Sequence, residues 1–203
     1  MRVALTFDAE QPDRPAPPGN AEALLALLAG RGVRASFFVQ GRWAEAYPAT
    51  ARAIVDGGHL VGHHSHYHAR LPLLTDAGIA EDVRDGATAI LDATGADPAP
   101  WFRCPFGAGA DDGRVLAVIA AAGYRHVGWH VAADDWEPVR TGADVADTVL
   151  RGVAAHGDGA VVLLHTWPTA TLEAIGPILD GLEAAGVDPC RIDELATVPA
   201  DVP

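Results

Sequence analysis

The chain has 203 residues, 49% of them apolar, which is enough for one packed domain with a sizeable core and argues against disorder. Its formal net charge of −13 argues against a nucleic-acid partner, because such partners require a basic surface. No apolar run approaches the about 20 residues of a membrane span, and two cysteines are too few for a disulfide scaffold.

Strand-like and helix-like segments alternate along the chain. We expect strands at Val3–Phe7, Ala35–Val39, Leu60–Gly62, Trp101–Arg103, residues 126–131, Ala160–Leu164 and residues 190–192. We expect helices at Ala21–Ala29 with Asn20 as N-cap, from Pro48 to Val55, after a Thr75 cap, and near residues 112–122, 143–155 and 172–185. The proline-rich stretch Asp8–Gly19 is expected to be a loop.

This alternation of strands and helices predicts a single α/β domain over residues 1–203. Repeated βα units without a hairpin signal indicate a parallel sheet, either doubly wound or closed as a barrel. Neither the dinucleotide G-x-G-x-x-G pattern nor a P-loop follows the first strand, so nothing indicates a nucleotide-binding fold. The first strand pattern begins at Val3 and leaves no room for a signal peptide, so we expect a cytoplasmic protein, or an extracellular one if a leader was removed.

Histidines are crowded into one short stretch. Five of the nine fall within ten residues: His59, His63, His64, His66 and His68. Imidazole is the commonest metal ligand and titrates near neutral pH, so the cluster indicates a metal site or an acid–base site, with a polar loop as the simpler alternative. The spacing of four between His64 and His68 suits two ligands, because one helical turn or a tight loop directs both rings to one place.

Other polar residues follow the expected strands directly. They are Asp8 and Glu10 after the first strand, His64 and His68 after the third, Arg103 after the fourth, Asp135 after the fifth and His165 after the sixth. In a parallel α/β barrel the carboxyl ends of the strands form one rim, where active sites are built. We therefore expect these side chains to converge.

Five segments resemble, in order, the motifs of the polysaccharide deacetylases with a NodB-homology domain (carbohydrate esterase family 4). The segments are Leu5-Thr6-Phe7-Asp8, His64-Ser65-His66-Tyr67-His68, Phe102-Arg103-Cys104-Pro105-Phe106-Gly107, Asp135-Trp136 and Leu163-Leu164-His165. The resemblance implies a distorted (β/α) barrel with about seven parallel strands and a divalent metal, usually zinc. It also implies a hydrolase that removes N-acetyl groups from an N-acetylglucosamine-containing glycan.

The resemblance also implies a role for each matching residue. Asp8 is the expected base, oriented by Arg103, and His165 is the expected acid, oriented by Asp135 and kept protonated by it. His64 and His68 are expected to bind the metal. The expected substrate contacts are a backbone N–H near Phe106 for the oxyanion, Leu163 for the acetyl group, and Trp136 and Trp167 beside the sugar. For these two large residues, a place in the core is the alternative.

One departure from the family pattern affects the metal site. The usual first motif is T-F-D-D-G, whose second Asp is a metal ligand, but this chain has Ala9 there and Glu10 in place of the glycine. Glu10 is the expected substitute ligand, with Asp13 or a water molecule as alternatives. We expect His63 and His66 to lie behind the ligands or in solvent, and Cys104 to serve packing.

The departure leaves two other functions open. One is a metal-dependent hydrolase for a small or cyclic non-sugar amide, since relatives of this domain act on such C–N bonds. The other is a non-catalytic glycan-binding relic of the same fold. The presence of both expected pairs, Asp8–Arg103 and Asp135–His165, argues against a relic, because binding alone requires neither.

Overall fold

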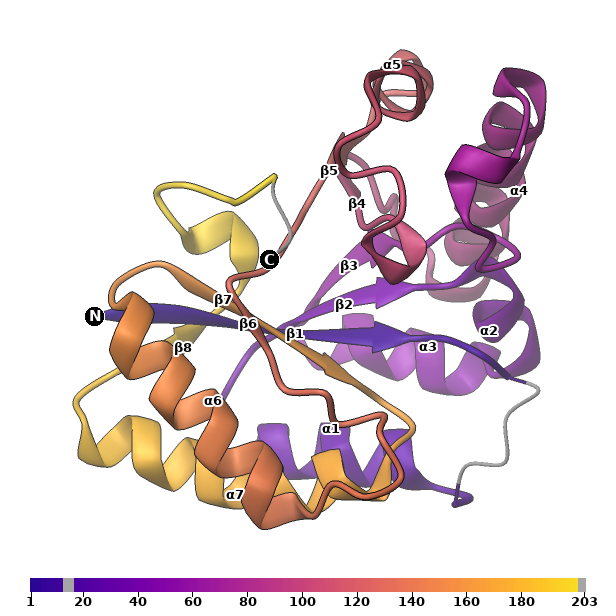
Figure 1. Cartoon of the computed structure of the whole chain (residues 1–203). Coiled ribbons are helices and arrows are strands. Elements are labelled where there is room, and N and C mark those ends of the chain that lie inside the picture. The colour runs from indigo at the N-terminus through magenta and orange to yellow at the C-terminus, as the bar shows by residue number, and fades with distance from the viewer. Residues whose placement is uncertain (13–16, 201–203) are drawn as a thin grey trace.

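In the computed structural model, which describes residues 1–12 and 17–200, a curled parallel sheet carries helices on its outer side (Figure 1). The strands are β1 (Arg2–Ala9), β2 (Ser36–Val39), β3 (Leu60–His63), β4 (Trp101–Phe102), β5 (Arg125–His126), β6 (Val131–Ala132), β7 (Ala160–His165) and β8 (Asp188–Cys190). The helices are α1 (Asn20–Gly30), α2 (Gly41–Ala46), α3 (Pro48–Asp56), α4 (Asp76–Thr94), α5 (Gly113–Ala121), α6 (Gly142–His156) and α7 (Thr169–Ala184). Among the described residues, none of these helices is long and apolar enough to cross a membrane.

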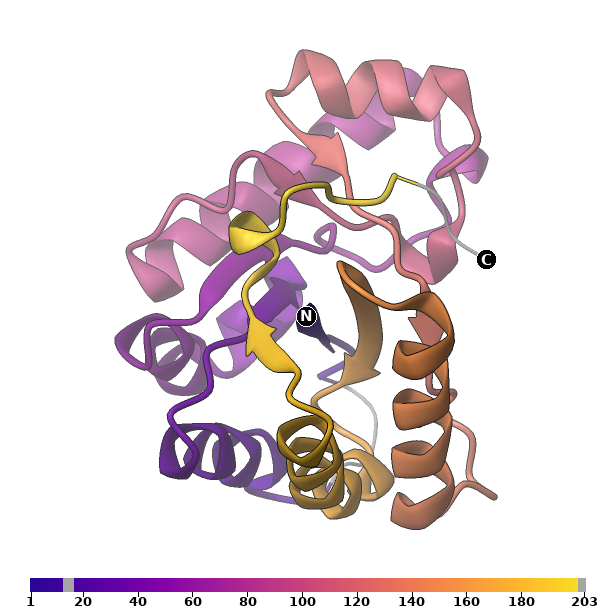
Figure 2. The same ribbon diagram turned by 90° about the vertical axis from the view of Figure 1, so that its left-hand side faces the viewer.

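The strands follow one path around the sheet, in the order β5-β4-β3-β2-β1-β7-β6, and every pairing is parallel. The short β8 pairs with the first residues of β1, Arg2–Ala4, whereas β2 pairs with its last residues, Thr6–Ala9. The path curls into a half-barrel with the helices around it, as the view along β1 shows (Figure 2). This confirms the predicted distorted barrel with about seven parallel strands.

Strand β1 lies at the centre of the fold, and its residues alternate between two environments. Leu5, Phe7 and Ala9 pack into the large apolar core shared with α1, α6 and α7. Ala4 instead belongs to the cluster inside the curl, with residues such as Phe38. Since side chains on a strand alternate with a period of two, Thr6 and Asp8 share the inner side with Ala4.

Most expected elements are present, and their ends differ by a few residues. Thr75 caps α4 as predicted, its side chain accepting a hydrogen bond from the Gly78 N–H at 3.2 Å. Asn20 is not an N-cap, which corrects the prediction, because the N-cap of α1 is Gly19 at a positive φ of 84°. The Asn20 amide instead donates to the carbonyl oxygens of Thr166 and Pro168, and so ties α1 to the segment after β7.

Three further segments differ from expectation. Helix α2 was not predicted, since six residues beginning with glycine carry too little periodic signal. The strand expected at residues 126–131 is two short strands, β5 and β6, at its two ends. The last strand, β8, lies two residues earlier than the expected 190–192.

Candidate active site and metal centre

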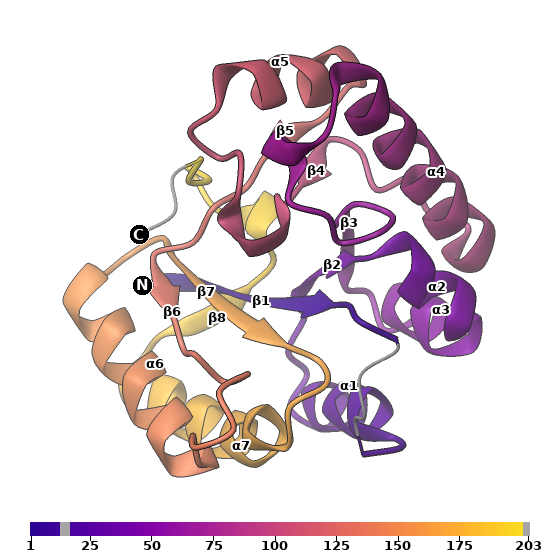
Figure 3. The same ribbon diagram turned by 45° about the vertical axis from the view of Figure 1, so that its right-hand side comes forward.

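The carboxyl ends of the strands surround a cleft of about 540 Å³. Its lining includes all but one of the predicted site residues: Asp8, Glu10, His64, His68, Phe106, Asp135, Trp136, Leu163, His165 and Trp167. The exception, Arg103, is fully buried behind Asp8. Figure 3 shows β1 and β7 running side by side toward this rim, so the predicted convergence is observed.

Three of these residues form a candidate metal centre. One oxygen or nitrogen atom from each of Glu10, His64 and His68 lies within 4.8 Å of the other two. Glu10 Oε2 is 3.2 Å from His64 Nε2 and also contacts His68 Nε2. A carboxylate and two imidazoles suit zinc and similar divalent ions, because three protein ligands leave a coordination position open.

The alternation along β1 explains why Glu10 can replace the missing acid. The side chain of Ala9 points into the apolar core with Phe7 and is fully buried there. Glu10, one residue later, returns to the side of Asp8 and reaches the cleft. Asp13, the other candidate ligand, lies outside the described residues.

The two histidines are held in place by the backbone. His64 Nδ1 donates to the Arg103 carbonyl oxygen at 2.9 Å, which directs Nε2 toward Glu10. The loop closes tightly, with positive φ angles at Ser65 (60°) and His68 (57°) and a 2.8 Å hydrogen bond from the His68 N–H to Ser65 Oγ. A tight loop, rather than a helical turn, therefore brings the two rings together. The Arg103 carbonyl oxygen fixes His64 Nδ1, as a hydrogen-bond acceptor does for the non-ligating nitrogen of many metal-binding histidines.

The pKa values of the three candidate ligands are shifted by burial and by their mutual contacts. Burial raises the pKa of Glu10, but hydrogen bonds from His64 and His68 outweigh it and hold that pKa well below its ordinary value. Burial lowers the pKa of His64, but Asp8 and Glu10 outweigh it and raise that pKa. Burial lowers the pKa of His68. A proton on His64 Nε2 thus lies where a divalent ion would bind, so metal binding should release it.

Asp8 lies beside the metal centre, with Oδ2 3.5 Å from His64 Nε2. Its Oδ1 accepts a hydrogen bond from Arg103 Nη1 at 2.8 Å. The guanidinium also donates to Thr6 Oγ1 and to the carbonyl oxygens of Val127 and Gly128. Burial lowers the pKa of Arg103 and Asp8 opposes that shift, while the ordinary arginine pKa is high enough to keep the group charged.

His165 faces the cleft from the end of β7, paired with Asp135. The ring Nδ1 lies 2.7 Å from Asp135 Oδ1, and the backbone N–H of His165 donates to Oδ2. Thr171 Oγ1 also donates to Oδ2 at 2.5 Å, a contact not predicted from the sequence. Burial lowers the pKa of His165, but Asp135, together with the charges of Glu10 and Asp8, outweighs burial and raises it to about 9. His165 is therefore an imidazolium at neutral pH, suited to donate a proton.

The predicted substrate contacts lie at the mouth and walls of the cleft. Phe106 has a positive φ of 59° and an exposed ring, with the Arg70 guanidinium 4.3 Å from its centroid. Trp136 is 45% exposed, which leaves its ring available to a ligand. Trp167 donates from Nε1 to Glu10 Oε1 at 3.4 Å, so it supports the metal centre as well as the wall.

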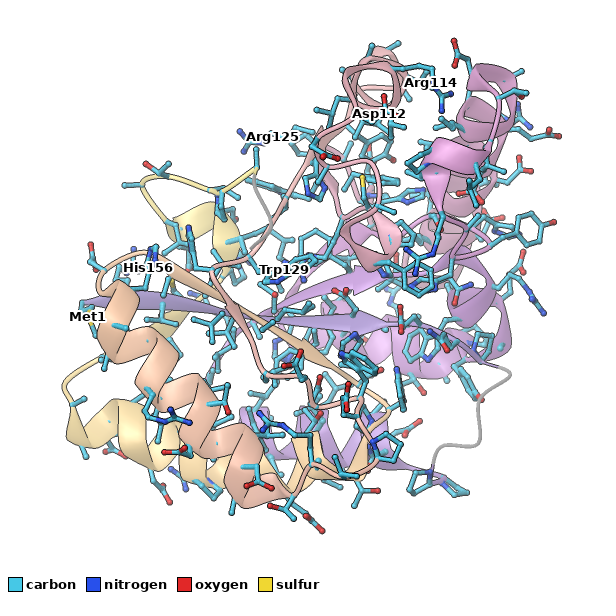
Figure 4. The ribbon with its side chains drawn as sticks, in the orientation of Figure 1. Met1, Asp112, Arg114, Arg125, Trp129 and His156 are labelled. Atoms are coloured by element: carbon cyan, nitrogen blue, oxygen red, sulfur yellow. The ribbon has the colours of Figure 1, made fainter. Side chains whose placement is uncertain are left out.

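Several lining residues were missed: Gln11, Arg70, Cys104, Trp129, Ala132 and Asp134. Trp129, labelled in Figure 4, comes from the segment between β5 and β6, which was predicted to be part of one continuous strand. Asp134 has a positive φ of 50° and is exposed; its position directly before Asp135 in the sequence is the feature that indicates its place in the cleft. Burial raises the pKa of the Cys104 thiol to about 12, which agrees with the packing role expected of it.

The remaining histidines of the cluster shape the loop. His63 Nε2 donates to the Val83 carbonyl oxygen, and its Nδ1 accepts from the Ser65 N–H. Burial lowers the pKa of His63 to about 3, so it is a neutral structural residue. His66 is also buried. His63 and His66 are therefore not in solvent; of the two placements expected from the sequence, they have the one behind the ligands.

Known proteins with similar sequences identify the family. The family model described as polysaccharide deacetylase matches residues 1–127. The chain belongs to the polysaccharide deacetylase family. It is 31% identical over 194 residues to the peptidoglycan-N-acetylglucosamine deacetylase PgdA of Listeria monocytogenes, covering 96% of this chain but 38% of that protein's length. It is 35% identical over 164 residues to a chitooligosaccharide deacetylase of Sinorhizobium fredii, covering 80% of this chain and 71% of that protein.

Solved structures of the family share the fold. A family 4 acetyl xylan esterase from Clostridium thermocellum, solved in complex with a cobalt ion, has a TM-score of 0.85 and 28% identity, covering 99% of this chain and 94% of that chain. A family 4 pseudoenzyme from Bacillus anthracis has a TM-score of 0.84 and 26% identity, covering 96% of this chain and 64% of that chain. Enzymes and a pseudoenzyme thus share this fold, so the fold alone does not decide catalytic activity, which depends on the residues of the cleft.

Proposed function

We propose that this polysaccharide deacetylase family member is a zinc-dependent hydrolase that removes N-acetyl groups from an N-acetylglucosamine-containing glycan. The observation that carries the proposal is the joint presence, in one cleft, of three metal donors, an Asp8–Arg103 pair and a His165–Asp135 pair. The named activities of the Listeria and Sinorhizobium relatives support this substrate class, and the cobalt complex of the esterase supports a divalent ion.

Glu10, His64 and His68 would hold the ion. Bound there, zinc lowers the pKa of water to about 7 and polarises the acetyl carbonyl. Asp8 takes a proton from the attacking water as the new C–O bond forms, with its orientation fixed by Arg103. His165 donates its proton to the amide nitrogen as the C–N bond breaks, so that acetate and a free amine leave.

The walls of the cleft suit a small acyl group on a sugar ring. Leu163 supplies an apolar surface on the His165 side, large enough to pack against a methyl group. Trp136 and Trp167 offer flat faces on which the apolar face of a pyranose can stack. These three residues would select an acetylated sugar by shape, since none of them carries a charge.

The test is zinc titration of chelator-treated protein by calorimetry, beside Glu10→Ala, together with acetate release from chitin oligomers. We expect one-to-one binding that weakens strongly in Glu10→Ala, and acetate release that is lost in Asp8→Asn and His165→Asn. Absence of zinc binding in the unmodified chain would overturn the proposal in favour of a glycan-binding relic. Zinc binding without acetate release, but with hydrolysis of small cyclic amides, would show that the substrate is a small non-sugar amide and not a glycan.

A further inference from the structure

The candidate metal centre is built from two segments that are distant in sequence. Glu10 follows β1, whereas His64 and His68 lie in the loop after β3. Three donor atoms within 4.8 Å require that these segments keep a fixed register. Strand β2 lies between β1 and β3, and its carboxyl end leads into Gln40, which is 2% exposed.

Gln40 makes hydrogen bonds to both segments. Its Oε1 accepts from the Gln11 backbone N–H at 2.7 Å, and its Nε2 donates to the His66 carbonyl oxygen at 3.1 Å. Its own backbone N–H donates to the Ala9 carbonyl oxygen, which continues the β1–β2 pairing. Because one partner is a donor and the other an acceptor, only one orientation of the amide satisfies both.

The bond to Gln11 stabilises an unusual turn. Gln11 has a positive φ of 56°, a conformation that a residue with a β-carbon adopts at a cost. In that conformation its side chain turns back, and Nε2 donates to Glu10 Oε1 at 3.0 Å. The oxygen of Glu10 that does not contact the histidines is thus held by Gln11 at 3.0 Å, with the longer bond from Trp167 at 3.4 Å beside it, as carboxylate ligands usually are by neighbours.

The histidine loop is seated closely on the start of α2, next to Gln40. The Gly41 and Arg42 N–H groups donate to the Ser65 and His66 carbonyl oxygens. Gly41 permits this approach, because a β-carbon there would lie 2.4 Å from His66 Nδ1. The start of α2 therefore holds the histidine loop, and Gln40, directly before it, links that loop to the segment that carries Glu10.

We propose that Gln40 and Gln11 are positioning residues that hold Glu10 in register with His64 and His68, which lets Glu10 replace the acid missing at position 9. This inference rests on the proposed function, since it concerns the same metal centre. Gln40 sets the distance between the two segments and the turn at Gln11, and Gln11 sets the direction of the carboxylate.

The test uses Gln40→Met and Gln11→Met, which keep the side-chain length and remove the amide. We expect the zinc dissociation constant, measured by calorimetry, to rise about ten- to hundredfold in each, as for other groups that support metal ligands. The control is Ile54→Val in the core, far from the cleft, which should lower the melting temperature of the metal-free protein without a change in zinc affinity beyond twofold.

A second readout does not depend on metal binding. In the metal-free protein, nuclear Overhauser contacts between the side chains of Glu10 and His68 should be present in the unmodified chain and lost in Gln40→Met. Unchanged zinc affinity in both methionine variants would overturn the inference while leaving the proposed function intact. If the unmodified chain bound no zinc, the proposed function would fail, and the retention or loss of these contacts in Gln40→Met would still decide whether Gln40 positions Glu10.

Discussion

Arg103 orients Asp8 with its side chain and His64 with its backbone. The guanidinium donates to Asp8 Oδ1 at 2.8 Å, and the carbonyl oxygen of the same residue accepts from His64 Nδ1 at 2.9 Å. One residue directly after β4 thus fixes both the expected base and a candidate metal ligand, although it does not itself reach the cleft. Its fully buried guanidinium also lies 4.0 Å from the centre of the Phe38 ring.

This burial predicts that Arg103 is a stability residue as well. Arg103→Met should lower the free energy of unfolding by about 3–5 kcal/mol, because it leaves the Asp8 carboxylate buried without its cation. Urea denaturation measures the effect. Asp8→Asn in the same background should recover part of the loss, since it removes the unpaired charge. A loss below about 1 kcal/mol would mean that water reaches Asp8, as at a surface pair.

Ala9→Asp restores the residue of the family motif, and we expect it to be harmful. The side chain at position 9 is fully buried in the apolar core beside Phe7, so an aspartate there would be an isolated buried acid. We expect a loss of several kcal/mol in urea denaturation. Zinc titration of the Ala9→Asp, Glu10→Ala double variant should show no recovery of affinity. Tight zinc binding by that double variant would refute the structural assignment of the two positions.

The position of Glu10 could have been derived from the sequence, while that of Gln40 could not. A period of two along β1 places Asp8 and Glu10 on one side, and the βα pattern places the site residues at strand ends. Other roles depend on hydrogen bonds between segments that are distant in sequence, which no local sequence pattern specifies. This applies to Gln11, Gln40 and Thr171. The same holds for the segment between β5 and β6, where Trp129 reaches the cleft although the sequence predicted a continuous strand.

Asp135 should control the protonation of His165. In Asp135→Asn the pKa of His165 should fall clearly below about 9, because burial is then opposed only by the remaining carboxylates of Glu10 and Asp8. Proton NMR of the imidazole in metal-free protein measures this. Thr171→Val is the control, since it removes one hydrogen bond to Asp135 and keeps the carboxylate, so the pKa of His165 should fall much less than in Asp135→Asn.

The same pair predicts a pH dependence of stability. The pKa of His165 is higher in the folded state than in the unfolded state, so the pair stabilises the fold fully below pH 6.5. That contribution is lost as the pH rises from 6.5 through about 9. The difference in unfolding free energy between the unmodified chain and Asp135→Asn should therefore shrink over this range, and a difference that grew with pH would contradict the ion pair.

His59 predicts the opposite dependence at acidic pH. Its Nδ1 accepts a hydrogen bond from the Ala35 N–H at 3.0 Å, and burial, assisted by the charges of Arg191 and Arg34, lowers its pKa to about 4. Since this pKa is lower in the folded state, the contribution of His59 to stability is complete above pH 6.5 and is lost as the pH falls toward 4.

His59→Asn isolates this effect, because the asparagine oxygen can accept from the Ala35 N–H without titrating. The slope of unfolding free energy against pH, measured by urea denaturation between pH 6.5 and 4.5, should flatten by up to one proton per molecule. The remaining slope should include His63 and His126, whose pKa values lie near 3 and 4. His59→Ala should flatten the slope equally but lower stability at every pH, since the Ala35 N–H then has no acceptor; an unchanged slope in both variants would show that His59 titrates normally in the fold.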